Sequence, residues 1–117
     1  MPLTLEENIF VTAGQVALTV RIGEAQKGRS LLELDGQEFF RGLVRDHPIG
    51  DGADLVGRTL LVDSVVVDIN PNTNRTSVRY ELSNAGVIRT FDLQFAVDAP
   101  GDTVDYTAVF HFLAGGG

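Results

Sequence analysis

His47 and His111 are the side chains best suited to acid–base or metal chemistry, and the chain contains no other histidine. Catalytic zinc usually takes three protein ligands, with histidines closely spaced on one element. These two histidines lie in separate parts of the sequence, without a third ligand at such a spacing. The chain also has no cysteine, which excludes thiol catalysis, cysteine-ligated zinc and iron–sulfur clusters. We therefore interpret His47 as a loop histidine and His111 as a surface or interface histidine.

The serines do not lie in a pattern typical of a nucleophile. Ser30, Ser64, Ser77 and Ser83 are all outside a G-x-S-x-G elbow. No glycine-rich loop ends in Lys-Ser or Lys-Thr, which a phosphate-binding P-loop requires. Paired carboxylates for glycoside hydrolysis stay open, because such pairs form in space rather than in sequence. The sequence therefore predicts no catalytic residue, and we expect that the protein is not an enzyme.

Two clusters of side-chain oxygens have the composition of calcium loops, because calcium prefers oxygen ligands. The clusters are Asp46, Asp51 and Asp54 in a glycine-rich stretch, and Asp68, Asn70 and Asn72 in an asparagine-rich one. The second cluster begins like a helix–loop–helix calcium loop, but Thr73 stands where that loop needs glycine and Arg79 where it needs glutamate. These residue types are also typical of turns, and we favour that interpretation. We expect no metal ligand and no cofactor, with calcium as the alternative.

The chain is acidic: 16 acidic and 9 basic residues give its 117 residues a formal net charge of −7. This charge opposes binding to nucleic acid and to anionic membranes, because both attract Lys and Arg. The sequence shows neither the pattern of a signal peptide nor an apolar run long enough for a transmembrane segment. We expect a protein that is cytoplasmic or belongs to an assembly released without a signal peptide.

Strands must position these side chains, since alternation of apolar and polar residues predicts three strands at 75–83, 87–97 and 104–112. Their expected inward faces are Thr76, Val78, Tyr80 and Leu82; Val87, Phe91, Leu93, Phe95 and Val97; and Val104, Tyr106, Ala108, Phe110 and Phe112. Turn residues separate the strands at 83–86 and 99–102. The pattern predicts an antiparallel meander.

The segment 58–69 predicts a further strand that is apolar on both faces. One face carries Leu61, Val65, Val67 and Ile69, and the other carries Leu60, Val62 and Val66. A strand of this kind is usually covered on both sides, by the rest of the chain or by a second subunit.

The first half of the chain predicts a strand at 15–22, with 9–12 as a short partner strand joined through Ala13 and Gly14. Asp35-Gly36 between apolar runs predicts a two-residue hairpin. A short helix at 36–47, capped by Asp35, is the alternative. We expect 46–57 to be a surface loop, because it is polar and rich in glycine.

These elements predict an all-β fold: a single antiparallel β-sandwich or flattened barrel of about seven or eight strands, with a C-terminal meander. We expect residues 1–114 to form a single β domain and residues 115–117 to form a flexible glycine tail.

The leading functional hypothesis is a non-catalytic structural or protein-interaction domain that acts as a homo-oligomeric assembly subunit. Its predicted interface consists of outward residues on two strands, namely Val65, Val67, Val109, His111 and Leu113. One alternative is a small carbohydrate-binding, lectin-like module, either with calcium or without it. Another is a carrier or enzyme with a pocket inside the barrel, lined by phenylalanines. The expected partners are a second copy or another protein, with carbohydrate as the alternative.

Overall fold

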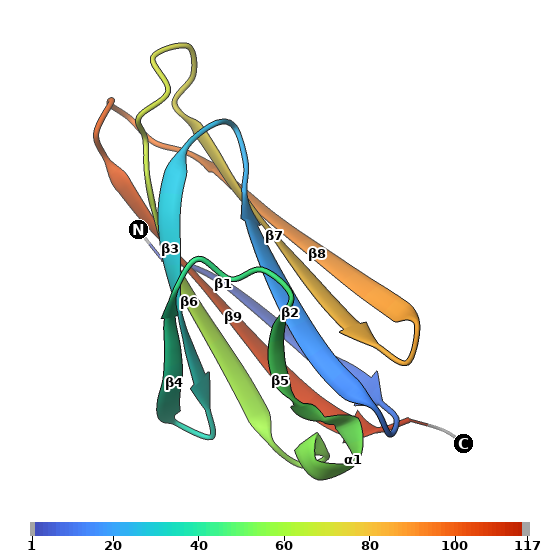
Figure 1. The fold of residues 1–117 in the computed structure, drawn as a ribbon. Helices are drawn as coiled ribbons and strands as arrows, with labels where there is room; N and C mark the ends of the chain where they lie inside the picture. The colour runs from blue at the N-terminus through green and yellow to red at the C-terminus, as the bar shows by residue number, and fades with distance from the viewer. Residues whose placement is uncertain (1, 116–117) are drawn as a thin grey trace.

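The computed structural model describes residues 2–115, which form two β-sheets packed face to face (Figure 1). In chain order, the elements of this part of the chain are β1 (Pro2–Val11), β2 (Gln15–Ile22), β3 (Lys27–Leu34), β4 (Gln37–Gly42), β5 (His47–Asp51), α1 (Gly52–Leu55), β6 (Thr59–Val67), β7 (Arg75–Asn84), β8 (Val87–Ala96) and β9 (Thr103–Ala114). No helix within these residues is long and apolar enough to cross a bilayer.

Sheet A has five strands in the order β1-β9-β6-β3-β4, and sheet B has four in the order β5-β2-β7-β8. The predicted all-β sandwich is confirmed, with nine strands in the described residues rather than the expected seven or eight. All neighbouring strands run antiparallel except β1 and β9, which are parallel along their whole length.

The expectation that residues 9–12 form a hairpin with β2 is wrong, because β1 belongs to sheet A and β2 to sheet B. The chain crosses between the sheets at Thr12–Gly14, and the side chain of Asn84 in β7 holds this crossing. Its Oδ1 accepts from the N–H of Thr12 at 2.9 Å, and its Nδ2 donates to the carbonyls of Thr12 and Gly14 at 3.1 and 3.2 Å. Asn84, together with contacts of Gly14 to Asp51 and Gly52, therefore holds the chain where the sequence predicted a turn.

The second half folds as predicted up to β8 and then departs from the meander. Ala85 and Gly86, with φ of 50° and 80°, close the predicted β7–β8 hairpin. The Pro-Gly turn after β8 also forms, but β9 pairs with β6 and β1 instead of β8. Two backbone hydrogen bonds hold this turn against the end of β6. Asp68 donates its N–H to the carbonyl of Asp102, and the carbonyl of Asp68 accepts from the N–H of Gly101. The predicted three-stranded meander is therefore wrong in its last pairing.

The ambiguous segment after β3 is a hairpin and not a helix. Asp35 and Gly36 have φ of 52° and 83°, as a two-residue hairpin turn with two left-handed residues requires. The expected loop at 46–57 is wrong, because β5 and α1 lie within it. β5 pairs with the first half of β2 only, from Gln15 to Leu18. This short pairing leaves the rest of that edge of β2 without a neighbouring strand.

The core lies between the sheets and is built by the predicted alternation. The inward residues Val78, Tyr80 and Leu82 of β7 are buried, as are Leu60, Val62 and Val66 of β6. The five predicted inward residues of β9, from Val104 to Phe112, are all buried. Gly115 donates its N–H to the carbonyl of Val11 at 2.7 Å, so the predicted tail is held at its first residue. The other two tail residues, 116 and 117, lie outside the described part of the chain.

Candidate interaction surfaces

The predicted interface residues come together on the outer face of sheet A. Val65 and Val67 belong to β6, and Val109, His111 and Leu113 belong to the neighbouring β9. Val65 and Leu113 are exposed, whereas the other three are half-buried. Their placement on one face agrees with the alternation in the sequence, although nothing in this placement tests whether a partner covers them.

His111 has a structural use on this face. Its Nε2 lies 2.6 Å from Oε2 of Glu6 in β1, and its Nδ1 lies 3.1 Å from the hydroxyl of Thr59 in β6. The imidazole therefore bridges the strands on both sides of β9.

Carboxylates interrupt the apolar residues of the same face. Asp63 of β6 is partly buried, and its Oδ1 has no hydrogen-bond partner among the described residues. Burial, followed by repulsion from Asp105 and Glu33, raises the pKa of the Asp63 carboxyl. Asp105 stands directly opposite Val65, and Glu33 opposite Leu61. The outer face of sheet A is therefore mixed in character rather than a continuous apolar patch.

The first predicted calcium cluster is used in local backbone contacts. The N–H of Asp46 donates to the hydroxyl of Thr19, which also donates to Asp46 Oδ1. Asp51 caps α1 by accepting from the N–H of Ala53 at 2.9 Å. Asp54 is exposed in the first turn of α1. Within residues 2–115 no three His, Asp or Glu side chains come together in a group that could hold a metal. Calcium binding stays a prediction.

The second predicted cluster divides between the core and the surface. Asp68 continues the inward face of β6 and is only 2% exposed, and neither of its carboxylate oxygens has a partner within the described residues. The Asn70 side chain instead closes a local turn by accepting from the N–H of Asn72 at 3.0 Å. Gln26, which the sequence did not single out, binds the N–H groups of Ile69 and Asn70. The turn interpretation holds for Asn70, whereas Asp68 is a buried carboxylate that the turn does not explain.

β8 is one of the two edge strands of sheet B. One hydrogen bond shows which of its backbone N–H and C=O groups point away from β7. Val20 of β2 donates its N–H to the carbonyl of Val44, away from β7. Val20 lies opposite Tyr80, so Tyr80 points its backbone groups away from β2 and toward β8. Tyr80 lies opposite Phe91, and these two residues therefore form a hydrogen-bonded pair. Phe91 therefore points its backbone groups toward β7. The N–H and C=O groups that point to the free edge belong to Ile88, Thr90, Asp92, Gln94 and Ala96.

The other three sheet edges carry features that block strand addition. β4 is short and has a register irregularity against β3. β5 has five residues, contains Pro48 and also has an irregular register. β1 places Glu7 on its inward face, and inward charges are a known device for protecting edge strands. β8 has ten residues in unbroken register and contains no proline, lysine or glycine, and Arg89 near its start is the one charge on the face of Phe91. It is a long regular strand at the margin of sheet B (Figure 1).

Apolar side chains gather near the start of β8. Ile88 is 65% exposed, and Phe10 of β1 is 59% exposed. Val87 of β8 is also 59% exposed, so the prediction that it faces inward is wrong. Phe10 and Val87 line one cleft of about 240 Å³. The open edge of β8 therefore adjoins exposed apolar surface.

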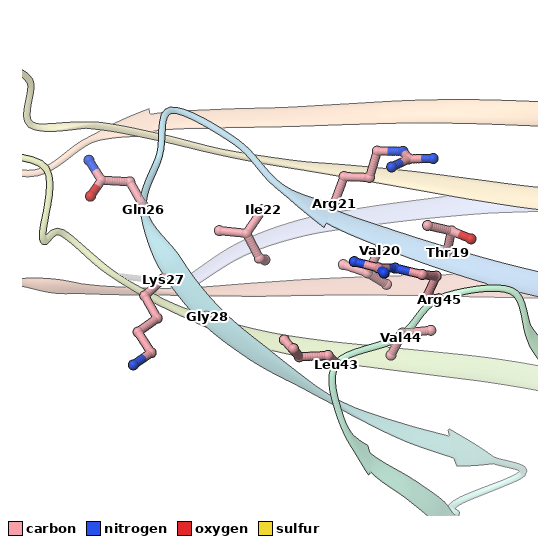
Figure 2. A pocket seen from close by; sticks show the side chains of 10 residues that line it. All are labelled: Thr19, Val20, Arg21, Ile22, Gln26, Lys27, Gly28, Leu43, Val44 and Arg45. Carbon is pink, nitrogen blue, oxygen red and sulfur yellow. The ribbon is translucent and has the colours of Figure 1, made fainter.

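A separate cleft of about 480 Å³ opens between the end of β2 and the start of β3 (Figure 2). Val20 and Ile22 of β2 line one side, and Leu43 and Arg45 of the β4–β5 connection line another. None of the ten lining residues is acidic or aromatic. This cleft is therefore not the phenylalanine-lined interior pocket that the sequence suggested. The predicted inward residues Phe110 and Phe112 are instead buried in the core.

Sequence reasoning did not identify the β8 edge or this cleft. The composition of β8 is visible in the sequence, but its position at an edge depends on the order of strands in the sheet. The cleft residues come from three separate segments without a shared motif. No protein-family model matches this chain, and comparisons with curated proteins and with solved structures find no significant match. The function must therefore be argued from the chain's own surfaces.

Proposed function

We propose that this protein is a non-catalytic protein-interaction domain that assembles with copies of itself through the free edge of β8. The observation that carries the proposal is the contrast between β8 and the other edges. β4 and β5 are short and irregular, and β1 carries Glu7 in the middle of its inward face, whereas β8 offers a long regular row of backbone donors and acceptors with Arg89 near its start as its one inward charge. Exposed rows of backbone groups of this kind pair with other strands.

A second copy fits this edge because the strand is complementary to itself. In a two-fold antiparallel pairing centred on Phe91, this residue lies opposite Phe91 of the second copy. Val87 then lies opposite Phe95 and Thr90 opposite Asp92. Moving the centre to Asp92 would place two carboxylates opposite each other, and like charges in that position are destabilising. The pairing centred on Phe91 is therefore the favoured register.

The pairing also extends the apolar inner face of sheet B. Phe91, Leu93 and Phe95 face inward and pack against the core as half-buried residues. A second β8 would extend this apolar row beyond the present margin of sheet B. Cross-strand aromatic and apolar pairs contribute about 0.2–1 kcal/mol each. Because one strand pairing buries a small area, we expect a weak dimer that forms at about 0.01–1 mM.

Analytical ultracentrifugation of proline variants tests the proposal. Thr90→Pro and Gln94→Pro remove N–H groups that point outward, so the ladder between β7 and β8 is kept. The matched controls Thr90→Ala and Gln94→Ala truncate the same side chains and keep the N–H groups. We expect dimers for the wild type and the alanine variants, and monomers for the proline variants with an unchanged circular dichroism spectrum. A wild type that stays monomeric at 1 mM, or folded proline variants that dimerise as well as the wild type, would refute the proposal.

A further inference from the structure

At the cleft between β2 and β3, the backbone groups along the edge of β2 are only partly paired with other segments. β5 covers this edge from Gln15 to Leu18, and the carbonyl of Val44 takes the N–H of Val20. Ile22 has the same backbone direction as Val20, because the direction repeats at every second residue. Its N–H and C=O therefore point into the cleft. The connection between β4 and β5 already follows this edge, and the position beside Ile22 is the next one along it.

Apolar side chains line this position. Ile22 packs against the core as a half-buried residue, and Leu43 on the opposite side of the cleft is 75% exposed. Figure 2 shows both side chains within the space between the two strands and the connection. A Cβ at Gly28 would lie 2.7 Å from the carbonyl oxygen of Val65 and 3.2 Å from Ile22, so larger residues do not fit there. The side chain of Ile22 therefore packs closely against the backbone of Gly28 at one side of the cleft.

The charge of the cleft is opposite to the charge of the chain. Lys27 and Arg45 line the cleft from different segments, with the amine of Lys27 directed away from the other labelled side chains (Figure 2), and neither forms an ion pair with any side chain that the structure describes. Arg21 also lines it but is paired with Glu81 at 2.8 Å. A cleft with two unpaired cations and no lining carboxylate, on a chain of net charge −7, favours an anionic occupant.

We propose that this cleft binds an extended acidic peptide segment of a partner protein. The backbone of the segment pairs with the N–H and C=O of Ile22, in the manner of strand addition. One apolar side chain of the segment lies between Ile22 and Leu43, and its carboxylates meet Lys27 and Arg45. The site is separate from the β8 edge, because β2 and β8 lie on opposite sides of β7. The proposal therefore goes beyond self-association and does not depend on it.

Fluorescence anisotropy with three labelled synthetic peptides tests the proposal. The peptides are Glu-Val-Glu-Val-Glu, Lys-Val-Lys-Val-Lys and Glu-Pro-Glu-Pro-Glu, of which the last lacks the N–H groups of its second and fourth residues. We expect saturable binding of the first only. A variant with Lys27→Glu and Arg45→Glu should weaken that binding about tenfold. The matched control, Arg41→Glu with Arg75→Glu, makes the same change in net charge away from the cleft and should change the affinity less than twofold.

Several results would overturn the proposal. Binding of the lysine peptide, or equal binding of the proline peptide, would show that charge pairing or backbone pairing is not the basis. Equal weakening by the two double variants would assign the effect to net charge alone. Absence of binding at 1 mM protein would remove the site. Thr90→Pro, which blocks the β8 edge, should leave peptide binding unchanged, so failure of one proposal is distinguishable from failure of the other.

Discussion

Replacing Asn84 with alanine removes the side chain that ties the crossing between β1 and β2 to β7. The amide of Asn84 makes three hydrogen bonds to backbone groups, to the N–H and C=O of Thr12 and to the C=O of Gly14. The hydroxyl of Thr12 adds a fourth, longer contact of 3.3 Å. The crossing has no hairpin turn of its own, because it joins two different sheets. Asp51 and Gly52 add two contacts to Gly14, and Asn84 supplies the remaining bonds that hold the crossing.

The size of the loss follows from these bonds. An intramolecular hydrogen bond contributes about 0.5–1.5 kcal/mol net, and the contacts of Asn84 are exposed or partly buried. We therefore expect Asn84→Ala to lower the free energy of unfolding by about 1.5–3 kcal/mol. For a domain of this size the midpoint of thermal unfolding should fall by about 5–12 °C. Asn84→Asp keeps the acceptor for Thr12 and loses both donors, so most of the loss should remain.

Urea unfolding followed by circular dichroism measures this loss, with the slope of the transition fitted alongside its midpoint. Asn72→Ala is the matched control, because the Asn72 side chain is exposed and makes no hydrogen bond within the described residues. The control should change the free energy of unfolding by less than about 0.5 kcal/mol. A loss of the same small size for Asn84→Ala would refute the reasoning, because the crossing would then be stable without its amide.

Three further changes test other parts of the fold. Gly52→Ala places a Cβ against the carbonyl oxygen of Thr12, so we expect thermal unfolding to show a loss of about 1–3 kcal/mol, and an unchanged midpoint would contradict the packing. Asp68→Ala removes two buried oxygens that have no partner, so chemical unfolding should show no loss of stability, and a loss above about 1 kcal/mol would contradict the absence of a partner. Asp63→Asn should raise the unfolding temperature at pH 7, because the raised pKa means that the charged carboxylate destabilises the folded state above that pKa. The difference from wild type should shrink as the pH falls through the raised pKa and vanish below the ordinary value of 3.8, whereas a difference independent of pH would rule out titration as its cause.

Alternation in the sequence predicted which side chains face inward, because the direction of a side chain is a local property of a strand. The inward faces of β7 and β9 and the hairpin at Asp35 and Gly36 were all confirmed. Left-handed φ values at such turns are also set locally, by residues that tolerate them.

The pairing of strands was not predictable in the same way. A Pro-Gly turn after β8 can lead the next strand into either sheet. Here the turn bonds to Asp68 at the end of β6, and the next strand joins sheet A. β1 pairs in parallel with β9, so strands from the two ends of the described chain lie side by side. A local sequence pattern does not predict such a pairing. β5 escaped prediction because Pro48 and Gly50 are typical of loops, although both fit a short irregular edge strand.

The predicted functional residues show the same limit. Alternation placed Val65 and Val109 on one outer face, but the closeness of Asp63 to Asp105 and Glu33 depends on β3, β6 and β9 being neighbours. Asn84 was assigned to a turn by its residue type, and its role depends on a contact 72 residues away in the sequence.

Amide hydrogen exchange of β8 at two protein concentrations tests the proposed assembly most directly. Phe91, Leu93 and the other odd-numbered residues of the strand should be protected at both concentrations, because their N–H groups face β7. The amides of Ile88, Thr90, Asp92 and Gln94 should exchange rapidly in dilute protein and at least about tenfold more slowly in concentrated protein. Rapid exchange of these amides at the highest concentration would contradict self-association through β8.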